Sequence, residues 1–273
     1  MTRATTIREL SAKLAALHFT QAKVQMLSDI ADALVKPVVV QSQSQDPIFG
    51  DARFHDYFSN VLLVHHATND DKFKKKAFEF AFRGACLGLG CDARITANPM
   101  NPGADVTVGT RRFSLKTEAG QNISRQNITI SKLMEARWIR NIVDEPARGT
   151  EAARKVVHHL NQYDRIIILR AFDVRTGQLR TAARYELWEI PKELLLLVGR
   201  LRESEFSSPT PNNSFAAPVK IVDSATGIPS RAFNFRMDGS VEKVTIGGLA
   251  VSHCIHQATW TVPVEPKDGE DED

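Results

Sequence analysis

The stretch from Asn101 to Gly120 constrains the possible fold more than any other part of the sequence. It reads NPGADVTVGTRRFSLKTEAG, which is two short β-rich runs joined by a tight connection that contains a glycine. A glycine near the turn between two such runs is a hairpin signal. Successive side chains of a strand point to opposite faces, so Ser114, Lys116 and Glu118 share a polar face. The residues between them form a mainly apolar face that can pack on a core.

The hairpin brings a further acid to this polar face. In the simplest register, Asp105 lies opposite the second strand near Ser114 to Lys116. Two carboxylates that converge on one point suit Mg²⁺, a hard cation that takes oxygen ligands. A lysine beside them can position or help to deprotonate a water and offset the charge of a phosphate, as metal-assisted phosphodiester hydrolysis requires. The alternative is a surface hairpin with solvated charges, since charged side chains are mostly exposed.

The spacing of these residues resembles the active-site motif of the PD-(D/E)xK nuclease superfamily, especially that of type II restriction endonucleases. The family motif is an acid, a spacer and acid-x-lysine on the second strand of a hairpin, and here Asp105 is followed after eight residues by Ser114-Leu115-Lys116. The sequence departs from the motif twice. Gly103-Ala104 precede Asp105 where the family often has proline, and Ser114 replaces the usual Asp or Glu. Some restriction enzymes carry Ser-x-Lys and supply the missing acid from elsewhere. The resemblance covers about residues 70 to 200.

The resemblance implies a role for each residue of the hairpin. Asp105 would bind Mg²⁺ directly, and the carbonyl of Leu115 would be a second ligand. Lys116 would position the attacking water, and Ser114 would line the site. An acid from another part of the chain would complete the metal site. The candidates for this acid are Glu118 on the same strand face, Glu79 upstream and Glu135 downstream.

The order of the predicted elements around the hairpin is similar to the core of the superfamily, which runs helix, three strands, helix, strand. Periodicity and turn signals define these elements. In chain order they are a helix that ends at Gly88, a strand at 92–97, the hairpin, helices at 131–142 and 150–160, strands at 165–171 and 183–190, and a helix at 191–202. We therefore expect an α/β (α+β) fold with a mixed central β-sheet flanked by helices.

The chain outside the nuclease core, which we place at 69–203, divides by composition. Apolar residues at helical spacing predict two helices between residues 5 and 36, and a segment rich in Ser, Pro and Asn predicts a loop. The expected regions are a helical N-terminal region at 1–68, a loop or linker at 204–218, a β-rich extension of the same domain at 219–264 and a disordered acidic tail at 265–273.

The charge distribution fits a protein that binds a polyanion. The net charge is +3 for the whole chain and −5 for residues 265–273, which leaves +8 for the rest. The alternative is that a net charge of +8 is ordinary for a chain of this length and that the acidic tail only aids solubility. Lys and Arg supply most of the affinity for DNA phosphates, and Arg, Lys and Gln can read bases. The predicted DNA contacts are Arg111, Arg112, Arg125, Lys132, Arg137, Arg140, Arg236, Lys243 and Gln257.

Composition also limits the compartment. No apolar run approaches the length of a membrane span, and the N-terminal residues MTRATTIREL lack a signal-peptide core. The three cysteines form no C-x-x-C pair, which argues against a disulfide framework and for a reducing compartment. We expect a cytoplasmic protein.

These observations lead to a functional hypothesis. It is a type II restriction endonuclease, a hydrolase that makes Mg²⁺-dependent, sequence-specific double-strand cuts in DNA. A palindromic target would call for a homodimer, with the N-terminal helices as the candidate interface and a methyltransferase specific for the same site as a partner. The alternatives are a repair or nicking endonuclease with the same site, a non-catalytic DNA-binding protein on a nuclease-like scaffold, which the departure at Ser114 keeps open, and an interaction protein whose hairpin is a coincidence.

Overall fold

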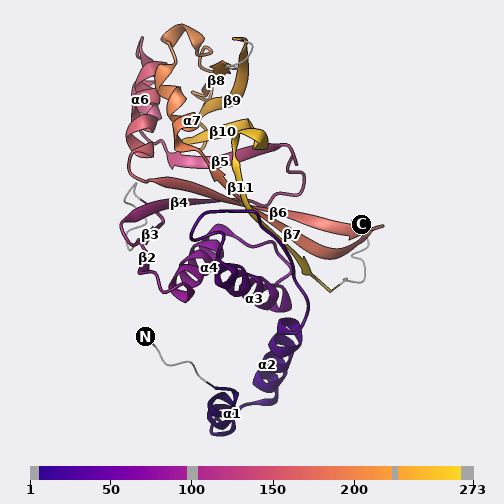
Figure 1. The fold of residues 1–273 in the computed structure, drawn as a ribbon. Helices are drawn as coiled ribbons and strands as arrows, with labels where there is room; N and C mark the ends of the chain where they lie inside the picture. Colours follow the sequence, from indigo (N-terminus) through magenta and orange to yellow (C-terminus); the bar gives the residue numbers. More distant parts are fainter. Residues whose placement is uncertain (1–5, 97–103, 223–226, 266–273) are drawn as a thin grey trace.

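A seven-stranded mixed sheet forms the centre of the protein. The computed structural model describes residues 6–96, 104–222 and 227–265 (Figure 1). The strand order is β1-β11-β7-β6-β4-β3-β2, and β4 and β6 are its one parallel pair among the described residues. The strands are β1 (Val39–Gln41), β2 (Ala93–Ile95), β3 (Val106–Val108), β4 (Arg111–Glu118), β6 (Arg165–Thr176), β7 (Leu179–Ile190) and β11 (Ile255–Pro263). The prediction of a mixed central sheet flanked by helices is confirmed.

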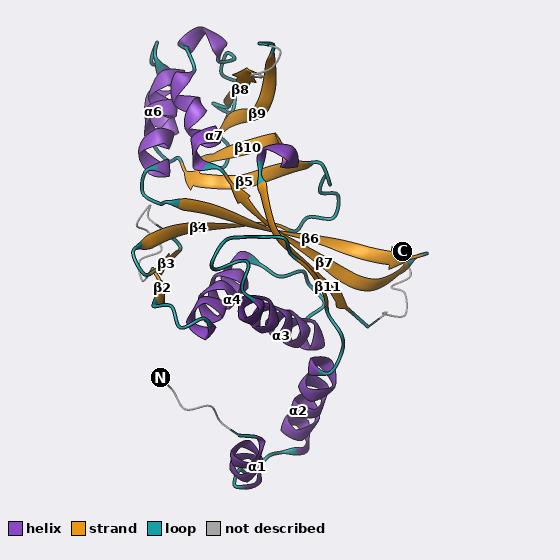
Figure 2. Ribbon diagram, in the orientation of Figure 1, coloured by secondary structure: helices purple, strands orange, loops and turns teal. Residues whose placement is uncertain are grey.

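Different layers cover the two faces of this sheet (Figure 2). Helices α3 (Ala52–Thr68) and α4 (Lys75–Gly88) pack on one face. On the other face lie helix α6 (Arg148–Leu160) and a second, antiparallel sheet in the order β5-β10-β9-β8. Its strands are β5 (Asn127–Glu135), β8 (Phe215–Val222), β9 (Pro229–Asp238) and β10 (Lys243–Ala250).

Strand β6 is buried on both faces, as its continuous apolar run predicts. Ile166 and Ile168 pack into the core with α6 and the second sheet. Ile167 and Leu169, which point the other way, pack into the core with α3 and α4. This strand therefore contributes side chains to both cores and connects the layers on the two faces of the sheet.

The predicted hairpin is confirmed as β3–β4. Val106 pairs with Phe113 and Val108 with Arg111. Gly109 in the turn has φ +57, a left-handed conformation that glycine adopts at little cost. Part of the connection that precedes Asp105 lies outside the described residues, including Gly103.

The helix predicted at 131–142 is wrong. Residues up to Glu135 belong to strand β5, and only the short helix α5 (Ile139–Ile142) follows. Ile128, Ile130 and Leu133 are buried in the core of the second sheet, but a register shift opposite β10 between Ile130 and Met134 interrupts the alternation. A β-bulge of this kind bends the strand and changes the spacing of its inward side chains. The apolar residues after it thus mimic a helical stripe.

Two predictions for the C-terminal part need correction. The loop predicted at 204–218 ends early, because Phe215, Ala217 and Val219 are buried in alternation in β8. The helix predicted at 191–202 is shorter: α7 (Lys192–Leu196) passes into a 3₁₀ turn at Leu197–Arg200. The expected β-rich extension divides, because β8 to β10 join the second sheet while β11 pairs with β7 in the central sheet. Apart from Glu265, the acidic tail lies outside the described residues.

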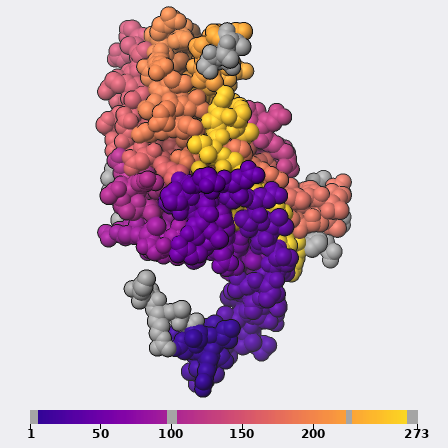
Figure 3. Space-filling model, viewed as in Figure 1, coloured from indigo at the N-terminus to yellow at the C-terminus, as the bar shows by residue number. Residues whose placement is uncertain are grey.

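The N-terminal helices α1 (Ile7–Ala15) and α2 (Gln21–Leu34) confirm the prediction of two helices in this region, and they extend from one end of the body (Figure 3). Helix α1 buries none of its residues, and α2 buries only Ala33. Apolar side chains on these helices and on the bend between them are exposed: Leu10 by 50%, Leu17 by 55%, Val24 by 47% and Leu27 by 40%. None of the described helices is long and apolar enough to cross a membrane.

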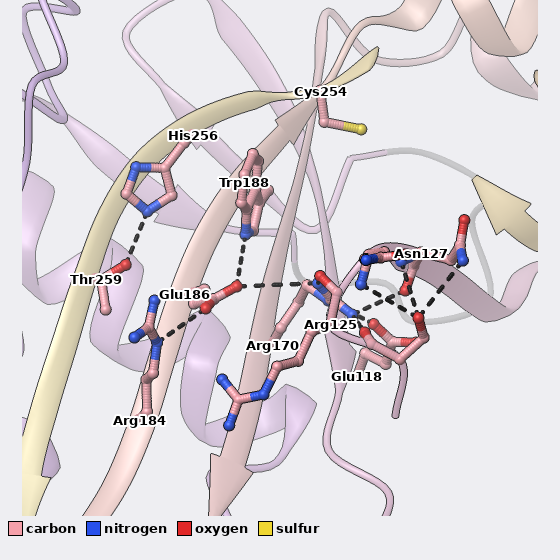
Figure 4. Close-up of polar contacts among 12 residues, drawn as sticks. Glu118, Arg125, Asn127, Arg170, Arg184, Glu186, Trp188, Cys254, His256 and Thr259 are labelled. Atoms are coloured by element: carbon pink, nitrogen blue, oxygen red, sulfur yellow. Dashed lines mark hydrogen bonds and ion pairs between the residues drawn. The ribbon is translucent and has the colours of Figure 1, made fainter. Parts of the chain in front are cut away.

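A buried arginine joins the two sheets (Figure 4). Arg170 on β6 is fully buried, and its Nε donates to Glu118 Oε2 on β4 at 2.6 Å. Its terminal nitrogens donate to three carbonyls at the start of β5, those of Ser124, Arg125 and Asn127. The other oxygen of Glu118 accepts the backbone N–H of Thr129 on β5 at 2.9 Å. This network attaches the first strand of the second sheet to the central sheet.

We expect Arg170→Met to lower the free energy of unfolding by about 3 to 5 kcal/mol, because it leaves the carboxylate of Glu118 buried without its partner. Urea denaturation of the purified protein measures this change. The control is Arg154→Met, which removes an exposed pair with Glu151 and should cost less than about 1 kcal/mol. In the double variant Glu118→Gln/Arg170→Met the cost should be less than the sum of the single variants. Equal effects of Arg170→Met and Arg154→Met would mean that the network does not hold the sheets together.

Candidate active site

The hairpin brings Asp105 beside strand β4, at the place that the sequence predicts. Asp105 stands just before β3, and its backbone N–H donates to the carbonyl of Phe113 at 2.8 Å. Its carboxylate Oδ2 accepts the backbone N–H of Leu115 at 2.7 Å and lies 3.4 Å from the hydroxyl of Ser114. The acid and the Ser-Leu-Lys segment therefore form one continuous site.

The polar face of β4 is buried. Ser114 is 2% exposed, Lys116 9% and Glu118 9%. The alternative of a solvated surface hairpin is wrong, because β5 lies over this face: the ammonium of Lys116 donates to the carbonyl of Leu133 on β5 at 3.1 Å. Burial lowers the pKa of Lys116 to about 8, although the nearby carboxylate of Asp105 acts in the opposite direction.

Of the three candidate acids, Glu79 is the one that the structure brings to Asp105. Glu79 lies in the first part of α4 and is 7% exposed. The ammonium of Lys75, one turn earlier on the same helix, contacts both acids: Asp105 Oδ1 at 2.8 Å and Glu79 Oε1 at 3.5 Å. The two carboxylates thus converge on one cation.

Glu118 and Glu135 have other partners. Both oxygens of Glu118 are engaged by Arg170 and the N–H of Thr129, so this side chain serves the junction between the sheets. Glu135 is exposed on β5 and pairs with Lys132. Neither reaches the carboxylate of Asp105 in the described contacts, and the geometry therefore favours Glu79 as the second acid.

Three residues near the site are absent from the sequence-based set. Lys75 lies four residues before Glu79 in the sequence, a spacing that is typical of an ion pair on a helix surface. His159 at the end of α6 and Tyr163 just after it are buried, with ring centroids 5.4 Å apart; His159 lies near the backbone of Leu133 and Tyr163 near the hydroxyl of Ser114. Both lie close to the β3–β4 hairpin: burial and the charge of Lys116 lower the pKa of His159 to about 4, and burial and the charge of Asp105 raise the pKa of Tyr163. The spacing of Lys75, His159 and Tyr163 along the chain gives no sign that they lie near the hairpin.

A groove lies between the end of β5 and helix α6. It has a volume of about 460 Å³. His159 lines this groove and is also close enough to the hairpin for the charge of Lys116 to lower its pKa. The lining residues are Met134, Glu135, Trp138, Arg154, Lys155, His158, His159 and Gln162.

The predicted DNA contacts are exposed, with two exceptions. Lys243 on β10 is partly buried, and Gln257 on β11 is 2% exposed with its amide bonded to Ser44 and Glu189. Gln257 therefore cannot reach a base, and that prediction is wrong; its strand belongs to the interior of the central sheet. Lys132 is exposed, but on β5 rather than on the predicted helix. The exposed residues are Arg111, Arg112, Arg125, Lys132, Arg137, Arg140 and Arg236.

Several of these cations already have partners within the chain. Arg112 pairs with Asp164 at 3.2 Å, and Arg140 pairs with Glu242. The guanidinium of Arg125 lies over the ring of Phe172, 5.2 Å from its centroid. Exposed ion pairs are weak, so phosphate groups can compete for these side chains.

Comparison with known proteins identifies the family of the chain. Residues 10–261 match the family model described as SmaI, type II site-specific deoxyribonuclease. The chain is 31% identical over 227 residues to the type II restriction enzyme SmaI of Serratia marcescens, a match that covers 80% of this chain and 83% of that protein. No solved structure matches the chain. The resemblance inferred from the hairpin motif is confirmed, and the chain belongs to the SmaI family of type II site-specific deoxyribonucleases.

Proposed function

We propose that this protein is a type II restriction endonuclease that makes Mg²⁺-dependent, sequence-specific double-strand cuts in DNA. The observation that carries the proposal is the buried hairpin, which holds an acid and a lysine of lowered pKa on one strand pair beside a second acid from α4. Membership in a family of site-specific deoxyribonucleases supports DNA as the substrate.

The side chains at the site fit a magnesium ion. Among the described residues no three His, Cys, Asp or Glu side chains come together as a metal cluster, but Mg²⁺ is usually held by one or two carboxylates and keeps several waters. Asp105 and Glu79 would supply the carboxylates and the carbonyl of Leu115 a third oxygen. The bound ion would supply charge neutralisation at the scissile phosphate and a lowered pKa for the attacking water.

The other residues of the hairpin would orient the reactants. Lys116, held by the Leu133 carbonyl in a buried position, would position the attacking water and accept its proton in the fraction of molecules where the lysine is neutral. Ser114 would line the site and hold Asp105 through its hydroxyl. Attack on phosphorus opposite the 3′-oxygen would leave a 5′-phosphate and a 3′-hydroxyl.

The exposed cations around the site would hold the DNA backbone. Two of these cations, Arg111 and Arg112, lie in the hairpin at the start of β4. The others flank β5 in the chain: Arg125 precedes it, and Arg137 and Arg140 follow it. Such contacts give affinity without sequence information. Arg236 and Lys243 lie on the second sheet, which is the candidate element for reading bases.

We also propose a homodimer that forms through α1 and α2. Their exposed apolar side chains have no partner surface in the described part of the chain, and apolar stripes at helical spacing are typical of helix–helix contacts. A second copy would cover them and match the two-fold symmetry of a palindromic target. A methyltransferase specific for the same site would protect the host DNA. All three cysteines are free, which is consistent with the proposed cytoplasmic location.

A second candidate function is specific DNA binding without cleavage. The observation that favours it is Ser114, which places a hydroxyl where the motif usually has a carboxylate. A nicking enzyme with the same site is the related catalytic alternative, and it would act as a monomer.

We expect discrete DNA fragments with Mg²⁺ but not with Ca²⁺ or EDTA, and a rate about 10² to 10⁴ times lower for Lys116→Ala, because a positioned base is lost. Several phage-length duplex DNAs incubated with purified protein provide the measurement. Asp105→Asn should lose cleavage as well. The control is Arg175→Ala, an exposed arginine near the tip of the β6–β7 hairpin, which should cut like the wild type. Intact DNA in every lane, with specific binding retained, would favour the non-catalytic alternative.

The rate of cleavage should rise with pH and level off near pH 8. The pKa of Lys116 is lowered to about 8, and only the neutral amine accepts a proton. Below that pH the neutral fraction falls tenfold per pH unit, and above it the fraction is constant. Single-turnover cleavage between pH 6 and about 9.5 measures the profile. Lys116→Gln should lose the break near pH 8; a break that persists in this variant would assign it to another group.

Sedimentation equilibrium should give twice the chain mass for the wild type and the single chain mass for Leu10→Asp/Leu27→Asp, because charged side chains cannot be buried in an apolar interface without a partner. The control is Leu179→Asp at the tip of the β6–β7 hairpin, which is 46% exposed and should leave the dimer intact. A monomeric wild type at micromolar concentration would contradict the dimer and favour the nicking alternative.

A further inference from the structure

The ammonium of Lys75 lies between the two carboxylates of the proposed metal site. It contacts Asp105 Oδ1 at 2.8 Å and Glu79 Oε1 at 3.5 Å. The proposed metal ion would bind these same two carboxylate oxygens. An ammonium and a metal ion cannot both occupy the space between the two carboxylates, so binding of the ion requires Lys75 to move.

The position of Lys75 in the helix makes its charge unfavourable locally. It is the first residue of α4, follows Lys74 and precedes Lys76, and the first turn contains no acid. Because the N-terminus of a helix carries a partial positive charge, cations there are disfavoured. The contacts with Asp105 and Glu79 offset this effect and explain why the side chain turns toward the site.

Lys75 is also the cation that can leave. Its side chain is 45% exposed, whereas those of Asp105 and Glu79 are 18% and 9% exposed. A long, half-exposed side chain at the start of a helix can swing into solvent without disturbing the core. Lys116 cannot do so, because it is buried and bonded to the Leu133 carbonyl, and Lys76 contacts only Glu79 of the two acids.

We propose that Lys75 is a resident cation that balances Asp105 and Glu79 before the metal ion binds and is displaced when it binds. This inference rests on the proposed metal site. It makes Lys75 a positioning residue that holds the two acids together and lowers the affinity of the site for the ion. Removal of its charge should therefore tighten metal binding by roughly three- to tenfold, the equivalent of the loss of two partly exposed ion pairs, one with each acid.

A merely structural role for Lys75 predicts the opposite sign. If the lysine only kept Asp105 and Glu79 in place, its loss would let two like charges separate, and metal binding would weaken. The direction of the change in affinity thus distinguishes displacement from support.

The experiment is calorimetric titration of the full-length protein with Ca²⁺ in the absence of DNA, so that binding is read without cleavage. Lys75→Met should bind Ca²⁺ three to ten times more tightly than the wild type. Lys75→Arg, which keeps a cation in place, should stay near the wild-type value. The matched control is Lys74→Met, which removes a lysine from the same helix end that pairs with Asp71 and contacts neither acid; its Ca²⁺ affinity should be unchanged.

Equal or weaker Ca²⁺ binding by Lys75→Met, with wild-type binding intact, would overturn displacement but leave the proposed function standing. Absence of binding by both the wild type and Lys75→Met would remove the metal site, and with it both proposals. Thermal melts of each variant without Ca²⁺ show that it is folded. Asp105→Asn/Lys75→Met should lose the binding that Lys75→Met gains, which assigns the effect to this site.

Discussion

The fold depends on the buried contact between Arg170 and Glu118. A fully buried guanidinium is costly to desolvate, and here the carboxylate and three backbone carbonyls compensate for the lost water. Those carbonyls belong to the segment that begins β5, so the arginine fixes where the second sheet starts relative to the central one. The rest of that sheet follows from β5 by antiparallel pairing.

The same contact determines the chemistry of the hairpin. With its first residues anchored by Arg170, β5 crosses the polar face of β4 and provides the Leu133 carbonyl for Lys116. That cover excludes water from Lys116 and lowers its pKa. A structural acid two residues further along β4, Glu118, thus creates the environment in which the lysine can act. This explains why Glu118, an acid on the same strand face as Lys116, does not reach the proposed metal site.

Local patterns predicted the parts of this structure that depend on neighbouring residues. The apolar run at Ile166–Leu169 indicated a strand buried on both faces, and the turn at Gly109 set the register that places Asp105 beside Ser114. The failures involve contacts between distant segments. The bulge in β5 depends on pairing with β10 more than 100 residues later, and the approach of Lys75 and Glu79 to Asp105 depends on how α4 packs. Neither has a signature within a short window of sequence.

Charge balance connects the two lysines of the site. Apart from Lys76, whose side chain contacts Glu79 but is 70% exposed, Asp105 and Glu79 are matched by Lys75 and Lys116, so these four side chains are neutral together when both lysines are protonated. A divalent ion added to that arrangement would leave an excess of two positive charges in a largely buried place, and one phosphodiester offsets only one of them. Withdrawal of Lys75 into solvent and loss of a proton from Lys116 each remove one positive charge. With an ion and a phosphate bound, one excess positive charge would remain at the proposed metal site, and either the withdrawal of the half-exposed Lys75 or the neutral form of Lys116, whose pKa is lowered, would remove it.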